Sequence, residues 1–290
     1  MPLVPTGEIV AAARARGVAA CAFNVITLEH AEAVAAGAEA AGQPVILQIS
    51  ENAVRFHSGR LAPLAAAARA VATSSAGDVG LHLDHVVSAG LLREAPEHGF
   101  GSVMVDYARL SYVDNVTATR QAVEFGHAHG LWLEAELGTV GGKPGEPSVD
   151  PHSPQARTDP DDAVSYVDAT GVDALAVAVG STHAMTSREA SLDHALIAAL
   201  RAAVPVPLVL HGSSGVPDGE LRRAVAGGLV KVNIGTALNV AFTAEVRGRL
   251  GADRALVDPR HYLHPARDAM AATVAHFCRL LSAPASRARG

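Results

Sequence analysis

The chain has 290 residues, of which 49% are hydrophobic and only 4% are aromatic, and it carries a formal net charge of −6 with an isoelectric point near 6.1. This length suits one large α/β domain or two smaller ones, and a core of Ala, Val and Leu is typical of a parallel sheet covered by helices. The acidic balance and the lack of a Lys/Arg cluster argue against nucleic acid or an anionic membrane as a partner.

The sequence also indicates a compartment. No apolar stretch reaches the length that spans a membrane, and the N-terminus lacks the charged segment and apolar run of a signal peptide. The two cysteines, Cys21 and Cys278, are far apart and in no C-x-x-C context, which is typical of reduced core thiols. We therefore expect a cytoplasmic protein.

Apolar runs of strand length alternate with segments of helical period along the whole chain. The predicted strands are Ala20–Val25, Pro44–Ile49, Val79–Leu83, Ser102–Asp106, Leu131–Leu137, Ala174–Val179, Leu208–His211 and Leu229–Ile234. The predicted helices are Leu28–Ala41, Leu61–Ser74, Ala89–His98, Val113–Gly130, Pro160–Thr170, Ser191–Val204, Pro217–Ala226, Ala237–Leu250 and a final Ala266–Leu281.

Eight strand–helix units predict a single (β/α)8 barrel, a TIM barrel with a C-terminal helical extension, over residues 1–281. We expect residues 282–290 to form a disordered tail. A doubly wound open sheet is the alternative, but it usually has fewer strands and a glycine fingerprint after strand one, where this chain has Phe23–Thr27. The longest irregular segment, Gly138–Thr158, is of a length typical of lids or disordered inserts.

Polar side chains collect at the C-terminal ends of the predicted strands, where the catalytic groups of such barrels lie. They are Asn24, Ser50, Asp84 with His85, Asp106, Glu134 with Glu136, His183, His211 and Asn233. Any one of them could be a turn residue, but three histidines and several acids on one rim favour a chemical site.

Three of these residues, His85, His183 and His211, predict a three-histidine metal site with an open fourth position, the arrangement of a catalytic zinc ion. Several other divalent ions also accept three imidazoles. Asp106 and Glu136 could orient the imidazoles or offer a second metal position. A Lewis-acidic ion that holds a carbonyl oxygen would favour an enolate or an alkoxide.

The third predicted strand ends in Asp84-His85. Adjacent strand residues point to opposite faces, but at a frayed end both can lean into one cavity. This geometry would place an acid–base carboxylate beside a metal-ligand imidazole.

Two later stretches are typical of anion cradles. His211–Gly215 follows strand seven, and Asn233–Thr236 follows strand eight directly before a helix. Small residues let backbone N–H groups approach a phosphate, and the helix N-terminus adds partial positive charge. Phosphate sites after strands seven and eight recur in these barrels.

These residues resemble the zinc-dependent class II fructose/tagatose-bisphosphate aldolases, the ketose-bisphosphate aldolase family, in one register over nearly the whole chain. The matching stretches are Ala22–Val25, Leu81–His85, Glu134–Gly138, Gly180–His183, Leu210–Ser214 and Lys231–Asn233, with Asp258–Arg260, Tyr262 and Pro265–Arg267 similar to a shorter subclass. The resemblance implies a homo-oligomeric (dimeric or tetrameric) lyase that reversibly cleaves a phosphorylated ketose, with fructose or tagatose 1,6-bisphosphate as the first expectation. The products would be dihydroxyacetone phosphate and an aldehyde, formed through a zinc-stabilised enediolate.

The resemblance also implies residue roles. The three histidines would ligate Zn²⁺ or another divalent ion, and Asp84 would move the proton of the C4 hydroxyl. The substrate and its C1 phosphate would be held by Asn24, Ser50, Gly212, Ser214, Asn233, Gly235 and Thr236. Arg260 would reach a second phosphate, in a neighbouring subunit, and a monovalent cation, Na⁺ or K⁺, would lie near the phosphate loop.

The chain departs from the family pattern at the aldehyde end. After Gly141-Gly142 relatives carry a glutamate that shuttles a carbon-bound proton, whereas here Glu146 is the nearest acid and lies between two prolines. Gly235 stands where relatives often carry Asp, Asn or Ala, and Ala184 replaces a frequent glycine. These departures leave open another phosphorylated keto sugar as substrate, a protein that binds zinc and sugar phosphate without efficient catalysis, and a metal-dependent hydrolase on the same barrel.

Overall fold

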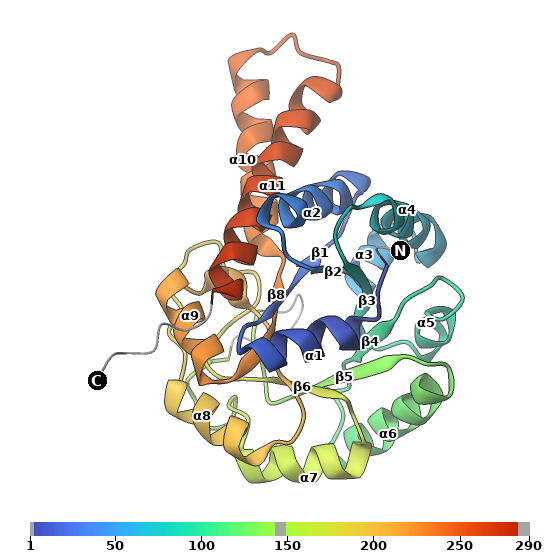
Figure 1. Ribbon diagram of the computed structural model, residues 1–290, viewed down its shortest axis with the longest axis vertical. Helices are drawn as coiled ribbons and strands as arrows, with labels where there is room; N and C mark the ends of the chain where they lie inside the picture. Colours follow the sequence, from blue (N-terminus) through green and yellow to red (C-terminus); the bar gives the residue numbers. More distant parts are fainter. Residues whose placement is uncertain (1–2, 143–148, 284–290) are drawn as a thin grey trace.

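A closed barrel of eight parallel strands forms the centre of the protein (Figure 1). The computed structural model describes residues 3–142 and 149–283. Strand β1 pairs with both β2 and β8, which closes the sheet and rules out the open alternative. The strands are β1 (Ala20–Asn24), β2 (Val45–Ser50), β3 (Val79–Val86), β4 (Ser102–Val105), β5 (Trp132–Leu137), β6 (Ala174–Val177), β7 (Leu208–Leu210) and β8 (Leu229–Ile234). The predicted (β/α)8 barrel is confirmed.

Helices connect the strands and surround the barrel (Figure 1). They are α1 (Thr6–Arg16), α2 (Leu28–Ala41), α3 (Glu51–Phe56), α4 (Leu61–Ser74), α5 (Ala89–Glu94), α6 (Tyr112–Ala128), α7 (Pro160–Thr170), α8 (His194–Ala203), α9 (Asp218–Gly227), α10 (Thr236–Ala252) and α11 (Arg260–Ser282). A short 3₁₀ turn, η1 (Ser213–Gly215), follows β7. The sequence signals hold at α7, where the Asp159 side chain accepts from two backbone N–H groups and Pro160 opens the helix.

The structure corrects the sequence reading at three helices. The strand and helix patterns did not predict α1 or α3. Helix α11 begins at Arg260 rather than Ala266, so Pro265 lies inside its first turns instead of preceding it. Pro265 is the sixth residue of this helix, so it removes the N–H that would otherwise donate to the His261 carbonyl.

Two apolar layers hold the barrel together. The larger core lies between the strands and the surrounding helices, with fully buried side chains such as Phe23, Leu47 and Leu133. A second cluster closes one end of the barrel, where Ile9 and Val10 of α1 pack against small residues of β1. Helix α1 crosses the barrel end that faces the viewer in Figure 1. The opposite end, where the strands terminate, is therefore the open one.

The barrel interior changes from apolar to polar along its axis. Residues two apart on a strand share one face. At the closed end the cluster beneath α1 includes Ala22 and Ile46. One step toward the open end come the fully buried polar side chains of Gln48, His82, Glu134 and Lys231. One step further come Ser50, Asp84, Glu136 and Asn233, at the strand ends.

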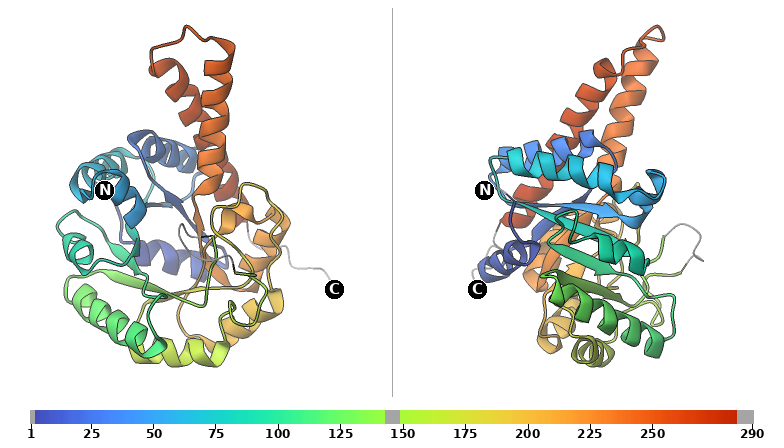
Figure 2. Two further views of the ribbon diagram at one scale, coloured as in Figure 1. Left: turned by 180° about the vertical axis from the view of Figure 1, so that it is seen from behind. Right: turned by 90° about the vertical axis from the view of Figure 1, so that its right-hand side faces the viewer.

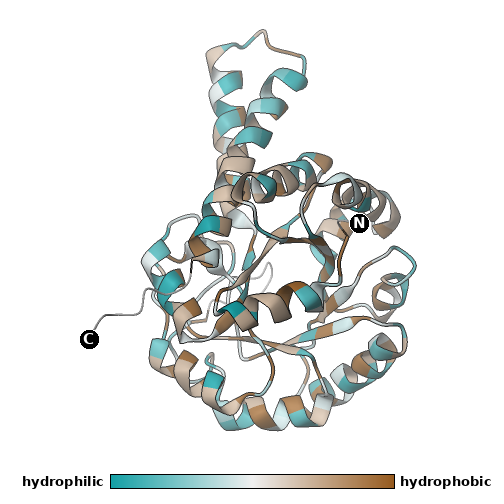
Figure 3. Cartoon of the chain, in the orientation of Figure 1, coloured by the Kyte–Doolittle hydropathy of each residue, from teal (hydrophilic) through white to brown (hydrophobic). Residues whose placement is uncertain are grey.

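Helices α10 and α11 pack together and project beyond the barrel as an arm (Figures 1 and 2). Only Leu238 is buried in α10, whereas α11 buries most of its second half against the barrel. The helices of the arm are largely hydrophilic toward the tip (Figure 3). Across the described part of the chain, no helix is long and apolar enough to cross a membrane.

Candidate active site

One large cavity of about 940 Å³ opens at the C-terminal ends of the strands. It is lined by residues from most of the βα loops, so that the segments singled out in the sequence converge there. The predicted site residues that line it are Asn24, Ser50, Asp84, His85, Asp106, His183, Gly212, Ser214, Asn233, Gly235 and Thr236. Glu136 lies beside it, in contact with His211.

Two predicted site residues are not placed in this cavity. Arg260 begins α11 on the arm, where its exposed side chain is ion-paired with Asp258 at 2.6 Å. Its predicted role concerned a neighbouring subunit and stays a prediction. Glu146 lies outside the described residues, and so do its neighbours 143–148.

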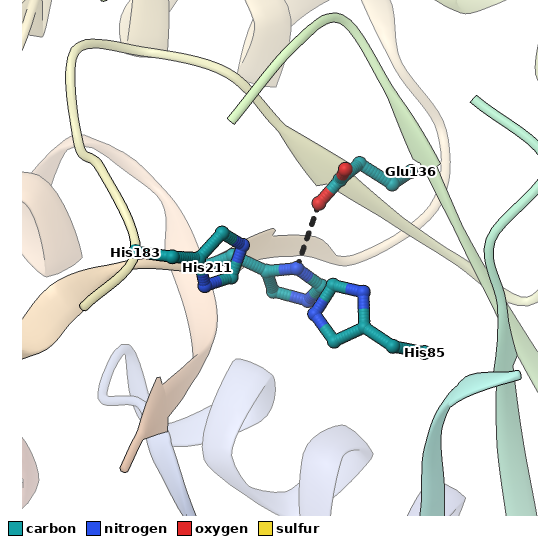
Figure 4. Close-up of side chains that lie close together, drawn as sticks. All are labelled: His85, Glu136, His183 and His211. Atoms are coloured by element: carbon teal, nitrogen blue, oxygen red, sulfur yellow. Dashed lines mark hydrogen bonds and ion pairs between the residues drawn. The ribbon is translucent and has the colours of Figure 1, made fainter. Parts of the chain in front are cut away.

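Three imidazoles and one carboxylate converge at the wall of the cavity, where His85 and His183 line it and His211 and Glu136 are buried (Figure 4). One ligand atom from each of His85, Glu136, His183 and His211 lies within 4.8 Å of the others. The ring centroids of the three histidines are 4.9, 5.2 and 5.8 Å apart. Three imidazole nitrogens and a carboxylate oxygen form a donor set that suits Zn²⁺ and similar divalent ions, so the residues present fit a metal.

The backbone of β3 directs the side chains of Asp84 and His85 into the same cavity. The pairing of β3 with β4 shifts register between Leu83 and Val86, and His85 has a left-handed φ of 49°. This bulge turns both side chains into the cavity instead of onto opposite faces. The His85 Nδ1 then lies 2.8 Å from the Asp106 carboxylate, which fixes the ring and directs Nε2 toward the metal cluster.

His211 lies between two carboxylates. Its Nδ1 is 2.8 Å from Glu136 Oε2, and its Nε2 is 3.0 Å from Glu134 Oε1. Because carboxylates only accept, both ring nitrogens donate and the ring is cationic in the metal-free protein. Burial opposes this charge, but the hydrogen bonds to Glu134 and Glu136 outweigh it and raise the pKa of His211 to about 9.

Asp84 is a buried carboxylate whose Oδ2 lies 4.0 Å from His85 Nε2 of the metal cluster. Its Oδ2 accepts from Gln48 Nε2 at 3.4 Å, whereas Oδ1 has no hydrogen-bond partner among residues 3–142 and 149–283. Burial raises the pKa of Asp84, but the positive potential of His85, His211 and other nearby cations lowers it more. Asp84 is therefore ionised, and can accept a proton beside the metal cluster.

The opposite side of the cavity is suited to an anion. Gly212, with a left-handed φ of 67°, starts η1, and Ser214 Oγ accepts from the Ala237 backbone N–H in the first turn of α10 at 3.1 Å. Thr236 is the first residue of α10. The loop after β7 and the N-terminus of this 17-residue helix thus meet at the cavity, as the sequence predicted.

Two predicted substrate residues have contacts within the protein. Ser50 is the N-cap of α3, where its Oγ accepts from the Ala53 N–H at 3.2 Å. Gly235 lies directly against Asn24, since a Cβ at this position would stand 2.7 Å from Asn24 Oδ1. The Asn24 amide therefore occupies space that a side chain at position 235 would need.

Sequence reasoning missed three members of the buried polar layer below the site, Gln48, His82 and Lys231, whereas it singled out Glu134. Gln48 binds Asn24 and Asp84, while His82 binds Ser102 at 2.8 Å. Burial, followed by the positive charge of Lys231, lowers the pKa of His82 to about 3, so its ring is neutral. Each member of this layer lies two positions before a predicted site residue, and that spacing is the signal that could have found it.

Comparisons of the sequence with known proteins point to one family. A sequence profile described as class-II fructose-bisphosphate aldolase matches residues 4–285. The chain is 35% identical over 275 residues to a fructose-bisphosphate aldolase of Staphylococcus aureus, which covers 94% of this chain and 95% of the relative. It is 36% identical to a fructose-bisphosphate aldolase of Thermus caldophilus, over 92% of this chain and 94% of the relative.

The fold agrees as well. The crystal structure of the YdjI aldolase from Escherichia coli K12 superposes with a TM-score of 0.82 at 29% identity, covering 98% of this chain and 100% of that one. The profile and both relatives extend over nearly the full chain, including the metal cluster and the arm. The chain belongs to the class II fructose-bisphosphate aldolase family.

Proposed function

We propose that this ketose-bisphosphate aldolase uses a divalent metal ion, Zn²⁺ in the first instance, to cleave a phosphorylated ketose into dihydroxyacetone phosphate and an aldehyde. The observation that carries the proposal is the arrangement around the histidine cluster. An ionised Asp84 lies on one side of it, with His85 Nε2 4.0 Å from Asp84 Oδ2. The loop of Gly212 and Ser214 with the N-terminus of α10 offers an anion site in the same cavity.

The roles of the chain's own residues follow from their chemistry. His85, His183 and His211 would hold the metal, which when bound polarises the ketose carbonyl and stabilises the negative charge left when the carbon–carbon bond breaks. The Asp84 carboxylate takes the proton of the C4 hydroxyl during cleavage and returns it during condensation. The Gly212 and Ser214 loop and Thr236 hold the C1 phosphate, which keeps the breaking bond beside Asp84.

The experiment is exchange of the dihydroxyacetone phosphate C3 protons with deuterated water, followed by NMR with and without a chelator. Metal-dependent exchange would establish carbanion formation next to the carbonyl without any assumption about the aldehyde. No exchange from metal-loaded protein would reject the proposal and favour binding without catalysis. Release of inorganic phosphate without triose phosphate would favour a hydrolase.

A different phosphorylated keto sugar is the second candidate. Gly235 favours it, because this residue lines the cavity without a side chain and Asn24 occupies the adjacent space. The measurement is turnover of fructose 1,6-bisphosphate against tagatose 1,6-bisphosphate and ketose phosphates of other chain lengths. Preference for a substrate outside the two bisphosphates by more than tenfold in kcat/KM would select the second candidate.

Three properties of the assembly belong to the same proposal. Residues 1–281 would act as one domain in a homo-oligomer, dimeric or tetrameric, in which Arg260 on the arm reaches a neighbouring site. A monovalent cation, Na⁺ or K⁺, would bind near the phosphate loop. A cytoplasmic location is supported by Cys21 and Cys278, which are both buried free thiols, as is usual in a reducing compartment.

A further inference from the structure

We propose that Lys231 is a positioning residue that orients two parts of the active site at once, the metal-ligand ring of His211 through Glu134 and the amide of Asn233 directly. Its side chain is fully buried inside the barrel. The Nζ donates to Glu134 Oε2 and to Asn233 Oδ1, both at 2.8 Å. This inference deepens the proposed function and rests on it.

The first branch runs to the metal cluster. Glu136, itself a member of the cluster, binds the Nδ1 of His211, whereas Glu134 binds Nε2 and is not a member. We infer that Nδ1 faces the metal position and that Glu134 fixes the proton on Nε2. Lys231 holds the other oxygen of Glu134 and compensates its buried charge, so the carboxylate cannot turn away from His211.

The second branch runs to the substrate pocket. An ammonium group only donates, so Lys231 must face the amide oxygen of Asn233 rather than its nitrogen. That leaves Asn233 Nδ2, a buried donor without a hydrogen-bond partner in the described ranges, next to the cavity that Asn233 lines. A buried orphan donor is costly, and a substrate oxygen would satisfy it. Lys231 therefore determines that this amide donates to the substrate instead of accepting.

The variant Lys231→Met removes the charge and both donors at similar length. We expect zinc affinity, measured by chelator competition, to fall about 10- to 100-fold. At saturating zinc we expect kcat to fall about 100-fold, the usual loss when one preorganised donor is removed. The visible spectrum of the Co²⁺-loaded variant should change as well, because the His211 ring is no longer fixed.

Two double variants separate the branches. In Lys231→Met with Asn233→Ala, kcat at saturating zinc should be no lower than in Asn233→Ala alone, since both changes remove one function. In Lys231→Met with Glu134→Gln, zinc affinity should recover toward wild type, because a neutral amide oxygen still accepts from His211 and no charge is left uncompensated. Turnover should stay low. This second double variant also tests the contact with Glu134 if Lys231→Met alone fails to fold.

The control is Thr119→Val, which removes a buried hydroxyl bonded to Asn115 and Tyr166 on the outer side of the barrel. It should lower stability and leave zinc affinity and kcat unchanged. Wild-type zinc affinity in Lys231→Met, or multiplicative losses of kcat in the first double variant, would overturn the inference. If wild-type protein turned over no ketose phosphate, the proposed function would fail, whereas zinc affinity and the Co²⁺ spectrum would still decide the Glu134 branch.

Discussion

The carboxylate of Asp84 is subject to two opposing effects. Burial disfavours its charge, while the histidines around it favour that charge and prevail. Its Oδ2, which accepts from Gln48, lies 4.0 Å from His85 Nε2, so the carboxylate stands beside the metal cluster. A base of this kind must be ionised before substrate arrives, and the neighbouring imidazoles achieve that inside a buried site.

The first prediction concerns this residue. Asp84→Asn keeps the shape but removes the proton acceptor, so kcat should fall about 10²- to 10⁴-fold while zinc stoichiometry stays the same. Steady-state cleavage and metal analysis of the same samples would measure both. Asp78→Asn, at an exposed position just before β3, is the control and should behave as wild type. Retention of more than a tenth of kcat in Asp84→Asn would assign the base elsewhere.

The second prediction concerns Ala184, which has a left-handed φ of 59° directly after His183. A Cβ is disfavoured in this conformation, so Ala184→Gly should raise the free energy of unfolding by about 0.5–1 kcal/mol. The same change at the exposed Ala66 in helix α4 should lower it by about 1 kcal/mol. Urea unfolding of both variants would compare them. Destabilisation of similar size in both would show that position 184 carries no strain.

The sequence reveals some residues of the active site but not others. The site histidines could be found because they follow apolar strands, a local signal. Gln48 and Lys231 lie inside strands. The role of such a polar residue can be recognised only when its partner on another strand is known, as Glu134 is for Lys231. Their function depends on contacts between strands that are far apart in the sequence.

At the scale of elements, the loop of His183 is held between the Gly141-Gly142 backbone and Gly212. The His183 N–H donates to the Gly141 carbonyl at 2.7 Å, and a Cβ on Gly142 would stand 2.3 Å from the His183 carbonyl oxygen. On the other side, a Cβ on Gly212 would stand 2.7 Å from the Thr182 carbonyl carbon. These backbones approach so closely that no side chain fits between the loops.

The third prediction follows from this contact. Gly212→Ala should lower the free energy of unfolding by about 2 kcal/mol or more and weaken zinc binding, because Thr182 and then His183 must shift. Gly17→Ala is the matched control: its φ of 66° is nearly that of Gly212, but nothing lies within 4 Å of the new Cβ. That control should cost about 1 kcal/mol and leave zinc affinity intact. Equal effects of both variants would mean that the backbone conformation, not the contact, is limiting.

Strand and helix periodicity predicted all eight strands, since each lies in an apolar run bounded by turns. It missed α1, whose role is to close the barrel end through Ile9 and Val10. It also missed α3, a single short helix capped by Ser50. Both depend on the assembled barrel rather than on a strong periodic signal of their own.

At the scale of the whole molecule, metal binding, protonation and folding are linked. The pKa of His211 is raised from 6.5 to about 9 by its two carboxylate partners in the metal-free protein. A raised pKa contributes stability that is fully present below about pH 6.5 and is lost as the pH rises through about 9. Zinc must displace one of the two ring protons of His211, so zinc binding becomes stronger as the pH rises.

The fourth prediction follows from this linkage. Between pH 6.5 and 8.5 the Tm contribution of the charged His211 should decline in chelator-treated protein, while the increase in Tm caused by zinc should grow. Zinc affinity should rise by up to about tenfold per pH unit over this interval. Thermal unfolding with chelator or with excess zinc, at several pH values, measures both trends. The variant Glu134→Gln should flatten them, and a zinc effect independent of pH would contradict the linkage.

The alternation of inward-facing residues has a consequence for the evolution of the chain. On β8 the inward positions Lys231 and Asn233 are separated by the outward Val232. An insertion or deletion of one codon within the strand would exchange the two faces, and would remove the internal charge and the substrate contact together. The turn at residues 253–259, at the tip of the arm, is under no such constraint within one subunit. Changes in length should therefore accumulate there among relatives, while the alternation of inward and outward residues along the eight strands is kept.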